Sequence, residues 1–480
     1  MAHTTHHQIE YGDFQTPLEL AEKICQKLKA LGVNPETIIE PTCGLGTFLE
    51  ASARFFSSAK RIIGVEINSA YLHALRDQQG KFENGRIEIR QGDFFDFAWE
   101  DLLNNLPGAI LVLGNFPWVT NAQLSVIGGA NLPEKTNFQR HRGLNAITGK
   151  SNFDISEWML MQAAGWLQRR HGYLAMLCKT AVARKLLSHL YSQQLQLADA
   201  AIFAIDAEKY FGAAVEACLL FCKFDSTSRH YDYEIFTSLE SKSGEHAGHR
   251  DEVMVRDLVA FDELRHLHGE SEMKWRSGVK HDCAAVMEFR RTPNGLMNGL
   301  GELVDIEPDY LFPLFKGSDL ANGKIASATR YVLMTQKLVG ESTEDIQKKA
   351  PKTWAYLEAH ARHLDGRKSR IYRNQPRFSI FGVGAYTFAP WKIAICGLYK
   401  TLQFRLVREI KGKPAIFDDT VYFLSFDDEQ QARKILQLLL SPPATKFLSS
   451  LIFWDEKRPI KAGILNRLDF RRLETLASHE

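Results

Sequence analysis

The segment LVLGNFPWVTN, residues 113–123, places an amide and two aromatic rings directly after an apolar run. The run Ala109–Leu113 has the composition of a buried strand and stops at Gly114. The four residues that follow could do chemistry: Asn115, Phe116, Pro117 and Trp118. An amide oxygen accepts hydrogen bonds, and an indole ring stacks on planar groups. At the carboxyl end of a strand in an open α/β sheet, where ligands bind, these residue types indicate a candidate reactive site.

A second candidate is the glycine turn in IIEPTCGLGTFLEA, residues 38–51. Gly44 and Gly46 permit a tight turn and let a ligand approach the backbone at the start of the next helix. Glu40 ends the preceding strand, and Thr42 and Cys43 lie in the turn. A G-x-G turn is common in proteins, so its meaning depends on the neighbouring strand ends.

Two later strand ends each carry a carboxylate. Glu66 and Ile67 end the strand in GVEINSAYL, and a carboxylate at that place is suited to ribose hydroxyls. Asp93 in RQGDFFDF can accept a hydrogen bond from an adenine amino group, and Phe94 can cover the ring. With the glycine turn, these residues indicate a nucleoside-containing cofactor. A nicotinamide dinucleotide is disfavoured because position 49, the third glycine of its G-x-G-x-x-G fingerprint, is Leu.

The elements that must position these residues alternate between strand-like and helical patterns. Seven strands are expected, at Thr37–Glu40, Arg61–Ile67, Arg86–Arg90, Ala109–Leu113, Gly172–Cys178, Ala200–Ile205 and Ala217–Phe224. Helices are expected at Phe48–Phe56, Asp154–Arg169 and Ala181–Gln194. This alternation predicts an α/β fold with βαβ units and a mostly parallel sheet. The short link around Phe211 has no room for a crossover helix, so the last strand is expected to be antiparallel, at or near an edge.

Length and composition limit the class of protein. At 480 residues, two or three domains are expected, and 45% hydrophobic with 24% charged residues is normal for a soluble globular chain. Seven irregularly spaced cysteines indicate reduced thiols rather than a disulfide framework. The N-terminus lacks an apolar signal segment, and no apolar run reaches the length of a membrane span. A cytoplasmic protein without a membrane partner or a metal site is therefore expected.

The chain is expected to contain two domains. Residues 1–230 should form the cofactor-binding domain, and 231–270 a boundary region that includes a polar stretch rich in Ser and His. In residues 271–480, short strands at Ile380–Phe388 and Lys392–Gly397 and a helix at Asp428–Leu440 indicate an α+β domain.

Positive charge is concentrated in the second domain. Between Ile346 and Lys413 there are 15 Lys and Arg against 3 Asp and Glu, a net charge of +12 in a chain whose total is +2. Aromatic residues are interleaved with these cations, a pattern typical of proteins that bind a phosphate backbone. The cations chosen as candidate contacts are Lys352, Arg367, Lys368, Arg370, Arg373, Arg377 and Lys392.

Three motifs resemble those of class I S-adenosylmethionine-dependent methyltransferases. EPTCGLGTF resembles motif I of the DNA-modifying branch, and NFPW resembles motif IV, usually N/D/S-P-P-Y/F/W. YGDFQTPLELAEKI resembles motif X, whose Thr and Pro, here Thr16 and Pro17, lie near the methionine end of the cofactor. The resemblance implies S-adenosyl-L-methionine as the cofactor and a seven-strand sheet with its last strand antiparallel.

Motif IV implies methyl transfer to a planar amino or amide nitrogen. Such an amine is a poor nucleophile because its lone pair is delocalised, and two acceptors for its N–H bonds can free that lone pair. The implied acceptors are the Asn115 side-chain oxygen and the Phe116 carbonyl, while Trp118 stacks on the base. Phe116 stands where proline is usual, although Pro117 still biases it towards extended backbone.

Two further segments follow in the family's order. GLNAITGKSNFDISEWML, 143–160, resembles the loop and helix after motif IV, and it implies packing of Phe153 against the adenine of the cofactor. EKYFGAAVEACLLF, 208–221, resembles motif VIII, and it implies that Phe211 contacts the base on the face opposite Trp118. Aromatic residues on both faces suit a base turned out of a duplex.

The motif order resembles that of gamma-class DNA amino-methyltransferases, which carry a C-terminal target-recognition domain. Segments 364–372, 378–395 and 453–469 resemble the recognition regions of N6-adenine members. The resemblance implies a monomeric restriction–modification methyltransferase that acts on adenine N6 in double-stranded DNA and has a cognate restriction endonuclease as a partner.

Other functions stay open at this point. Cytosine N4, RNA and protein amide methyltransferases have related motif IV sequences, although the protein glutamine enzymes are much shorter. Phe116 also allows a non-catalytic DNA-binding module with a vestigial cofactor site. The segment DYEIFTSLESK, 232–242, contains a carboxylate followed by E-x-K, a short and common pattern that also occurs in nucleases.

Overall fold

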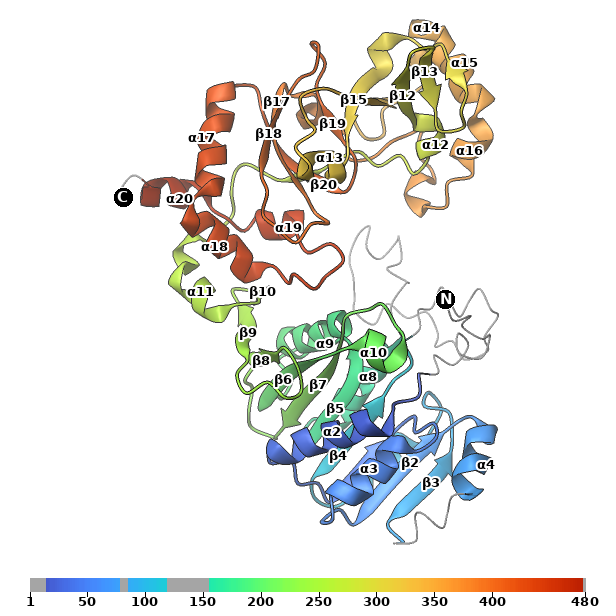
Figure 1. Cartoon of the computed structure of the whole chain (residues 1–480), viewed down its shortest axis with the longest axis vertical. Coiled ribbons are helices and arrows are strands. Elements are labelled where there is room, and N and C mark those ends of the chain that lie inside the picture. Colours follow the sequence, from blue (N-terminus) through green and yellow to red (C-terminus); the bar gives the residue numbers. More distant parts are fainter. Residues whose placement is uncertain (1–13, 78–84, 119–154, 478–480) are drawn as a thin grey trace. The chain divides into compact units, whose positions relative to one another are not determined.

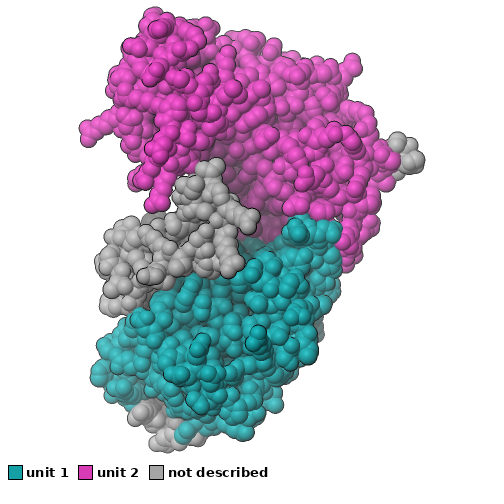
Figure 2. All heavy atoms as spheres, turned by 180° about the vertical axis from the view of Figure 1, so that it is seen from behind, with its two compact units in different colours: residues 1–258 teal, residues 259–480 magenta. Residues whose placement is uncertain are grey.

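The computed structural model describes residues 14–77, 85–118 and 155–477. The chain divides into two compact units, Met1–Leu258 and Val259–Glu480 (Figure 2). The division lies inside the segment 231–270 in which the sequence suggests a boundary.

The first unit is built on a ten-stranded sheet in the order β10-β9-β8-β6-β7-β5-β4-β1-β2-β3 (Figure 1). The seven strands expected from the sequence are all present: β1 (Thr37–Glu40), β2 (Arg61–Glu66), β3 (Ile87–Gln91), β4 (Ile110–Asn115), β5 (Gly172–Lys179), β6 (Asp199–Ile205) and β7 (Ala217–Phe224). Strands β1 to β5 pair in parallel. Strand β7 is antiparallel to both of its neighbours, as expected.

Two expectations for this sheet are wrong. Strand β7 lies between β5 and β6 rather than at or near an edge, because it pairs along its whole length on both sides and three further strands follow β6. The sheet also has more than seven strands, because β8 (Tyr233–Phe236), β9 (Glu245–Arg250) and β10 (Val253–Val255) extend it beyond β6. The polar composition of this segment had favoured a boundary region.

Helices cover both faces of the sheet because successive strand residues point to opposite sides. On one face, Ile38 and Leu111 pack against α2 (Leu18–Ala30) and α3 (Thr47–Phe55). On the other, Ile39 and Val112 pack against a second set of helices, α5 (Trp99–Asn104), α8 (Ile155–Trp166) and α9 (Thr180–Ser192). Helices α4 (Ser69–Asp77) and α10 (Ala207–Phe211) complete the set that positions the site. The carboxyl ends of β1, β2, β3 and β4 therefore meet at one edge of the sheet.

The second unit contains two sheets. The four-stranded sheet has the order β11-β20-β17-β18, with β11 (Arg276–Ser277), β17 (Trp391–Cys396), β18 (Arg405–Arg408) and β20 (Val421–Phe426). The six-stranded sheet has the order β14-β13-β12-β16-β15-β19, with β12 (Glu288–Thr292), β13 (Gly295–Asn298), β14 (Leu303–Val304), β15 (Leu311–Phe315), β16 (Arg330–Leu333) and β19 (Ile416–Phe417).

Helices accompany both sheets of the second unit. They are α11 (Leu258–Glu263), α12 (Ala284–Met287), α13 (Gly317–Ala321), α14 (Asp345–Lys349), α15 (Pro351–Ala359), α16 (Ala361–Asp365), α17 (Glu429–Leu440), α18 (Pro442–Leu451), α19 (Ala462–Leu465) and α20 (Phe470–Ala477). The expected helix at Asp428–Leu440 is α17, whose N-cap Asp428 accepts a hydrogen bond from the Gln431 N–H. The second unit is thus an α+β arrangement.

One strand predicted in this unit is wrong. The stretch Ile380–Phe388 forms turns and a short 3₁₀ helix, Ala385–Phe388, with a single bridge from Phe381 to Lys280. Its apolar composition suited a strand, but Gly382 has a φ of 70°, which extended backbone does not allow. No helix within the described ranges is long and apolar enough to cross a membrane.

Candidate functional site

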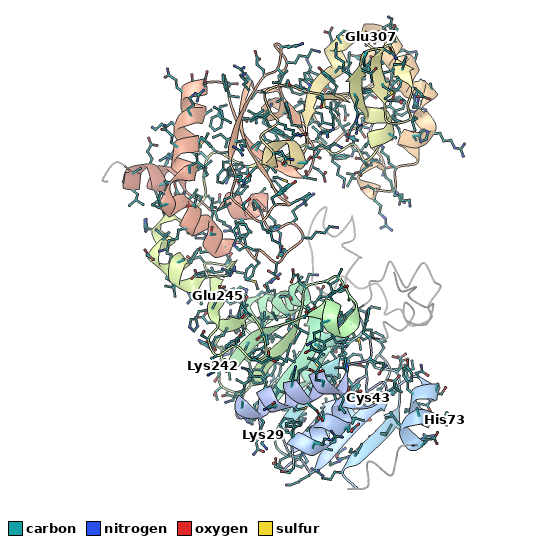
Figure 3. All side chains as sticks on the ribbon, viewed as in Figure 1. Lys29, Cys43, His73, Lys242, Glu245 and Glu307 are labelled. Atoms are coloured by element: carbon teal, nitrogen blue, oxygen red, sulfur yellow. The ribbon has the colours of Figure 1, made fainter. Side chains whose placement is uncertain are left out.

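A cleft opens at the carboxyl ends of β1, β2, β3 and β4, with about 1040 Å³ of empty space that includes solvent at its mouth. Most residues expected to bind the cofactor line it: Thr16, Glu40, Thr42, Cys43, Gly44, Glu66, Ile67, Asp93 and Phe94. Figure 3 labels Cys43, which lies in the glycine turn between β1 and α3. Asn115 and Pro117 line the same cleft. Sequence positions 16 to 117 therefore converge on one place.

Two of the expected cofactor residues, Pro17 and Gly46, are not among those that line the cleft. Pro17 is the N-cap of α2, and its carbonyl accepts hydrogen bonds from two N–H groups of that helix. Gly46 is the N-cap of α3 with a φ of 77°, and a Cβ there would lie 2.5 Å from Leu75. Both residues shape the ends of helices beside the cleft. Phe153 lies outside the described residues.

The glycine turn is tied to the end of β2 by a carboxylate. Glu66 accepts hydrogen bonds from the Gly44 N–H through Oε2 at 2.8 Å and from the Asn68 N–H through Oε1 at 2.7 Å. Gln15 accepts a third from the Leu45 N–H at 3.2 Å. The turn is therefore held in place by side chains from two other segments.

Glu40 is a buried carboxyl group at the base of the cleft. It is 4% exposed, and its Oε2 has no hydrogen-bond partner among residues 14–77, 85–118 and 155–477. Burial, together with the nearby Glu66 charge, raises the pKa of Glu40 well above its ordinary value. Because a buried polar atom without a partner is unfavourable, a donor or cation on a ligand would stabilise this carboxyl. The cleft therefore fits a ligand with an ammonium group.

Asn115 presents a free acceptor to the same cleft. Its Nδ2 donates to the Phe14 carbonyl at 3.0 Å and lies 3.5 Å from the Thr16 hydroxyl. Because only the amide nitrogen can donate to a carbonyl, these contacts fix which way the amide points. Its Oδ1 is buried and has no partner in the described part of the chain. The arrangement can accept a hydrogen bond from an amino group in the cleft.

Of the remaining NFPW residues, Pro117 lines the cleft, whereas Phe116 and Trp118 are buried and are not among its lining residues. Phe116 is 1% exposed and packs edge-to-face on Phe94, with ring centroids 5.3 Å apart. Trp118 is 5% exposed and contacts Phe14 at 5.7 Å and Phe211 at 5.1 Å. Trp118 and Phe211 thus touch each other, and a planar ring can enter between them only if they separate.

Some residues of the cleft were missed from the sequence. Phe14 and Gln15 precede Thr16 within YGDFQTPLEL, and Asn68 and Tyr71 follow Glu66 within GVEINSAYL. Their only signal was adjacency to a motif, because their contributions depend on how the segments pack together.

The basic residues of the second unit fall into two groups. One expectation is wrong: Lys392 is 1% exposed and donates from Nζ to the carbonyls of Ala389 and Ala415, so it cannot contact a nucleic acid. Burial lowers its pKa to about 7. The pattern of charge could not reveal this, because β17 is buried on both faces by residues distant in the sequence.

Three other candidate cations are engaged within the unit. Arg367 donates to the carbonyls of Leu364 and Ser379 and stacks on Tyr372 at 3.7 Å. Lys352 pairs with Asp305, and Arg377 pairs with Glu358. By contrast, Lys368, Arg370 and Arg373 are exposed and form no ion pair with any described residue.

Comparisons with known proteins identify the family. No protein-family model matches the sequence. The chain is 57% identical to the Type II methyltransferase M.NspV of Nostoc sp. over 471 residues, which cover 98% of each protein. Solved structures with lower similarity include the Type IIL restriction-modification enzyme MmeI in complex with DNA (TM-score 0.47, 13% identity, 96% of this chain and 76% of that one). Another is the methyltransferase subunit of a type I restriction-modification system from Streptococcus thermophilus (TM-score 0.33, 15% identity, 49% and 53%). The identity along nearly the whole of both sequences shows that the chain belongs to the Type II methyltransferases.

Proposed function

We propose that the protein is a site-specific DNA methyltransferase of the gamma class, which methylates the N6 amino group of adenine in duplex DNA. The observation that carries this proposal is the Asn115 side chain, whose oxygen is buried, unpaired within the described structure and fixed in orientation at the cleft. The 57% identity to a Type II methyltransferase supports a restriction–modification setting.

S-adenosyl-L-methionine would supply the electrophilic methyl group on its sulfonium. The cleft has a suitable residue for each part of such a molecule. Glu66 suits the ribose hydroxyls, and Asp93 and Phe94 suit the adenine. Glu40, the buried carboxyl with an unpartnered oxygen, suits the ammonium group of the methionine end.

The reaction requires the amino nitrogen to act as a nucleophile. We assign the Asn115 oxygen and the Phe116 carbonyl as acceptors for its two N–H bonds, which pull the nitrogen towards tetrahedral geometry and release its lone pair. The N–C bond would form as the S–CH3 bond breaks and the sulfonium leaves as a neutral thioether, after which the positively charged nitrogen loses one proton to solvent. No strongly basic side chain is required, since the product ammonium is very acidic.

The target base must leave the duplex to reach the cleft. Trp118 and Phe211 are the residues proposed to stack on its two faces. Their rings are 5.1 Å apart between centroids, at 67° to each other, so the entering base would replace their mutual contact. Such stacking contributes about 1–3 kcal/mol per base.

The second unit is proposed to bind the DNA. Its exposed cations Lys368, Arg370 and Arg373 can neutralise phosphates without first breaking an ion pair to a described residue. They lie in the segment 364–372 and just beyond it, where the sequence resembles a recognition region.

The experiment is methyl transfer from labelled S-adenosyl-L-methionine to duplex DNA, RNA and protein, followed by analysis of the modified nucleoside. Label in N6-methyladenine of duplex DNA is expected. Asn115→Ala should lower transfer by at least about 10²-fold while cofactor binding stays within about threefold. Label only in N4-methylcytosine, RNA or protein would reject the proposed substrate. Full activity of Asn115→Ala would reject the assigned acceptor.

A further inference from the structure

The ring of Phe116 belongs to a cluster of aromatic side chains beneath the cleft. Phe94 lies at its centre; Phe95 follows it in the chain, and its other partners come from three other segments of the first unit. Centroid distances from Phe94 are 5.3 Å to Phe116, 5.5 Å to Trp166, 5.6 Å to Trp99, 5.8 Å to Phe95 and 6.1 Å to Trp158. We call these six residues the aromatic cluster.

Phe94 is held at both its ring and its backbone. The ring is 5% exposed and forms part of the cleft wall. The Trp99 indole N–H donates to the Phe94 carbonyl at 2.8 Å, in a buried contact. A ligand ring placed on Phe94 therefore presses on a preformed and rigid surface.

Phe116 connects this surface to the NFPW segment. Its neighbours Asn115 and Pro117 line the cleft, whereas its own side chain is buried in the core with Phe94 and Met159. The side chain of Phe116 is thus anchored in the core, while the residues before and after it line the cleft. The carbonyl assigned above as an acceptor belongs to this anchored residue. A proline at this position would lack that anchor.

We propose that Phe116 is a positioning residue that couples the cofactor's adenine to the acceptor carbonyl. The adenine packs on the Phe94 ring, the Phe94 ring packs on the Phe116 ring, and the Phe116 ring holds the Phe116 peptide unit in place. This inference rests on the proposed function, since it takes the adenine site at Phe94 and the acceptor role of the carbonyl from it. It gives the unusual residue of the motif a role that the side chain of proline cannot fill.

The first test is equilibrium binding of S-adenosyl-L-methionine to wild type, Phe94→Leu, Phe116→Leu and the double variant. Each single variant should raise Kd by about two- to tenfold, the range that one aromatic pair contributes. The double variant should raise Kd by clearly less than the product of the two single effects, because both remove the same contact. Effects that simply multiply, or an unchanged Kd in Phe116→Leu, would overturn the inference.

Phe203→Leu provides a matched control for loss of core packing. Phe203 is 0% exposed, stacks on Phe236 at 4.6 Å and belongs to the core on the opposite face of the sheet. The Phe203→Leu variant should lower the thermal unfolding midpoint about as much as Phe116→Leu does, while leaving the Kd for S-adenosyl-L-methionine unchanged. If Phe203→Leu raised the Kd as much as Phe116→Leu, the rise would reflect general destabilisation, and the positioning role would be overturned.

Turnover at saturating cofactor provides the second readout. Phe116→Leu should lower kcat for DNA methylation by more than Phe94→Leu, because only Phe116 carries the acceptor carbonyl. Equal kcat values in the two variants would contradict the coupling. Failure of the proposed function would look different: wild type would bind no S-adenosyl-L-methionine or would label no DNA.

Discussion

The side-chain amide of Asn115 is oriented by a backbone carbonyl that lies far away in the sequence. The Phe14 carbonyl accepts from its amide nitrogen at 3.0 Å, so the oxygen is left to face the cleft. This dependence gives a prediction for Asn115→Asp. A carboxylate has no donor for the Phe14 carbonyl and would place two acceptors against each other.

Asn115→Asp should therefore lower kcat by about tenfold to hundredfold, the effect of leaving one buried acceptor unsatisfied. Initial rates with saturating DNA and cofactor would measure it. Wild-type kcat in Asn115→Asp would show that the Phe14 contact does not orient the acceptor.

The proposed stacking of Trp118 on the target base gives a second prediction for a single residue. If its ring stacks on the target base, Trp118→Phe should retain most activity, whereas Trp118→Ala should lose about 1–3 kcal/mol of transition-state stabilisation. The ratio kcat/KM for DNA measures this loss. The idea fails if both variants lose the same activity, since that would point to a packing role against Phe14 and Phe211.

In the segment 366–377, Arg367 holds the loop in place, whereas several nearby basic residues are exposed. Arg367 binds the carbonyls of Leu364 and Ser379 and stacks on Tyr372, which fixes the backbone on both sides. Lys368, Arg370 and Arg373 are exposed. Their combined replacement by Gln should weaken DNA binding. The slope of log Kd against log salt concentration should fall by up to the contribution of about three phosphate contacts.

A matched control removes the same charge from ion-paired sites in the first unit. Lys23, Arg54 and Lys60 each pair with a glutamate, and their replacement by Gln should leave the salt slope nearly unchanged. Fluorescence anisotropy with a labelled duplex at several salt concentrations measures both variants. Equal slopes in the two triple variants would move the DNA-binding surface elsewhere.

Strand β17 contains a buried amine whose titration should be visible in stability. Burial lowers the pKa of Lys392 to about 7, below the value of an unfolded lysine. Between that pH and about 10.4, the unfolded chain binds more protons than the folded one, so the free energy of unfolding should rise with pH. The rise is at most about 1.4 kcal/mol per pH unit, and below pH 7 the full cost of burying the charge remains.

Urea unfolding midpoints at pH 7 and pH 9 test this prediction in wild type and Lys392→Met. Wild type should gain stability relative to the variant as the pH rises. The same pH dependence in both proteins would show that Lys392 is already neutral or is hydrated in the folded state.

The elements around the cleft could be predicted from sequence because each depends on local pattern. Most of strands β1 to β7 are apolar runs, β3 alternates apolar and polar residues, and the glycine turn and the acidic residues lie at or just after the strand ends. Strands β8 to β10 could not be predicted, since their partly polar residues join the sheet only by pairing in succession, β8 with β6, β9 with β8 and β10 with β9. The burial of Lys392 and the Phe14–Asn115 contact also depend on distant segments, which no local pattern contains.

At the scale of the whole molecule, the proposed cofactor site and the proposed DNA-binding residues lie in different units. The cleft belongs entirely to the first unit, and the exposed cations proposed to bind DNA belong to the second. The basic segment Ile346–Lys413 carries +12 in a chain of net charge +2, so DNA attraction should be local rather than a property of total charge.

This division predicts independent loss of the two binding steps. Replacement of Lys368, Arg370 and Arg373 should weaken DNA binding while the Kd for S-adenosyl-L-methionine stays within about twofold, as expected for sites that share no residues. Isothermal titration of each variant with the cofactor would measure this. A large change in cofactor Kd would indicate that the cations act on the cleft rather than on DNA.

The central claim is that the Asn115 side-chain oxygen accepts a hydrogen bond from the amino group of an adenine. Its most direct measurement is the nucleoside composition of genomic DNA from a host without adenine methylation that expresses wild type or Asn115→Ala. The account predicts N6-methyladenine in the first DNA and none in the second, at equal protein levels. Genomic DNA without N6-methyladenine in the wild-type cells, or with equal amounts in both, would contradict it.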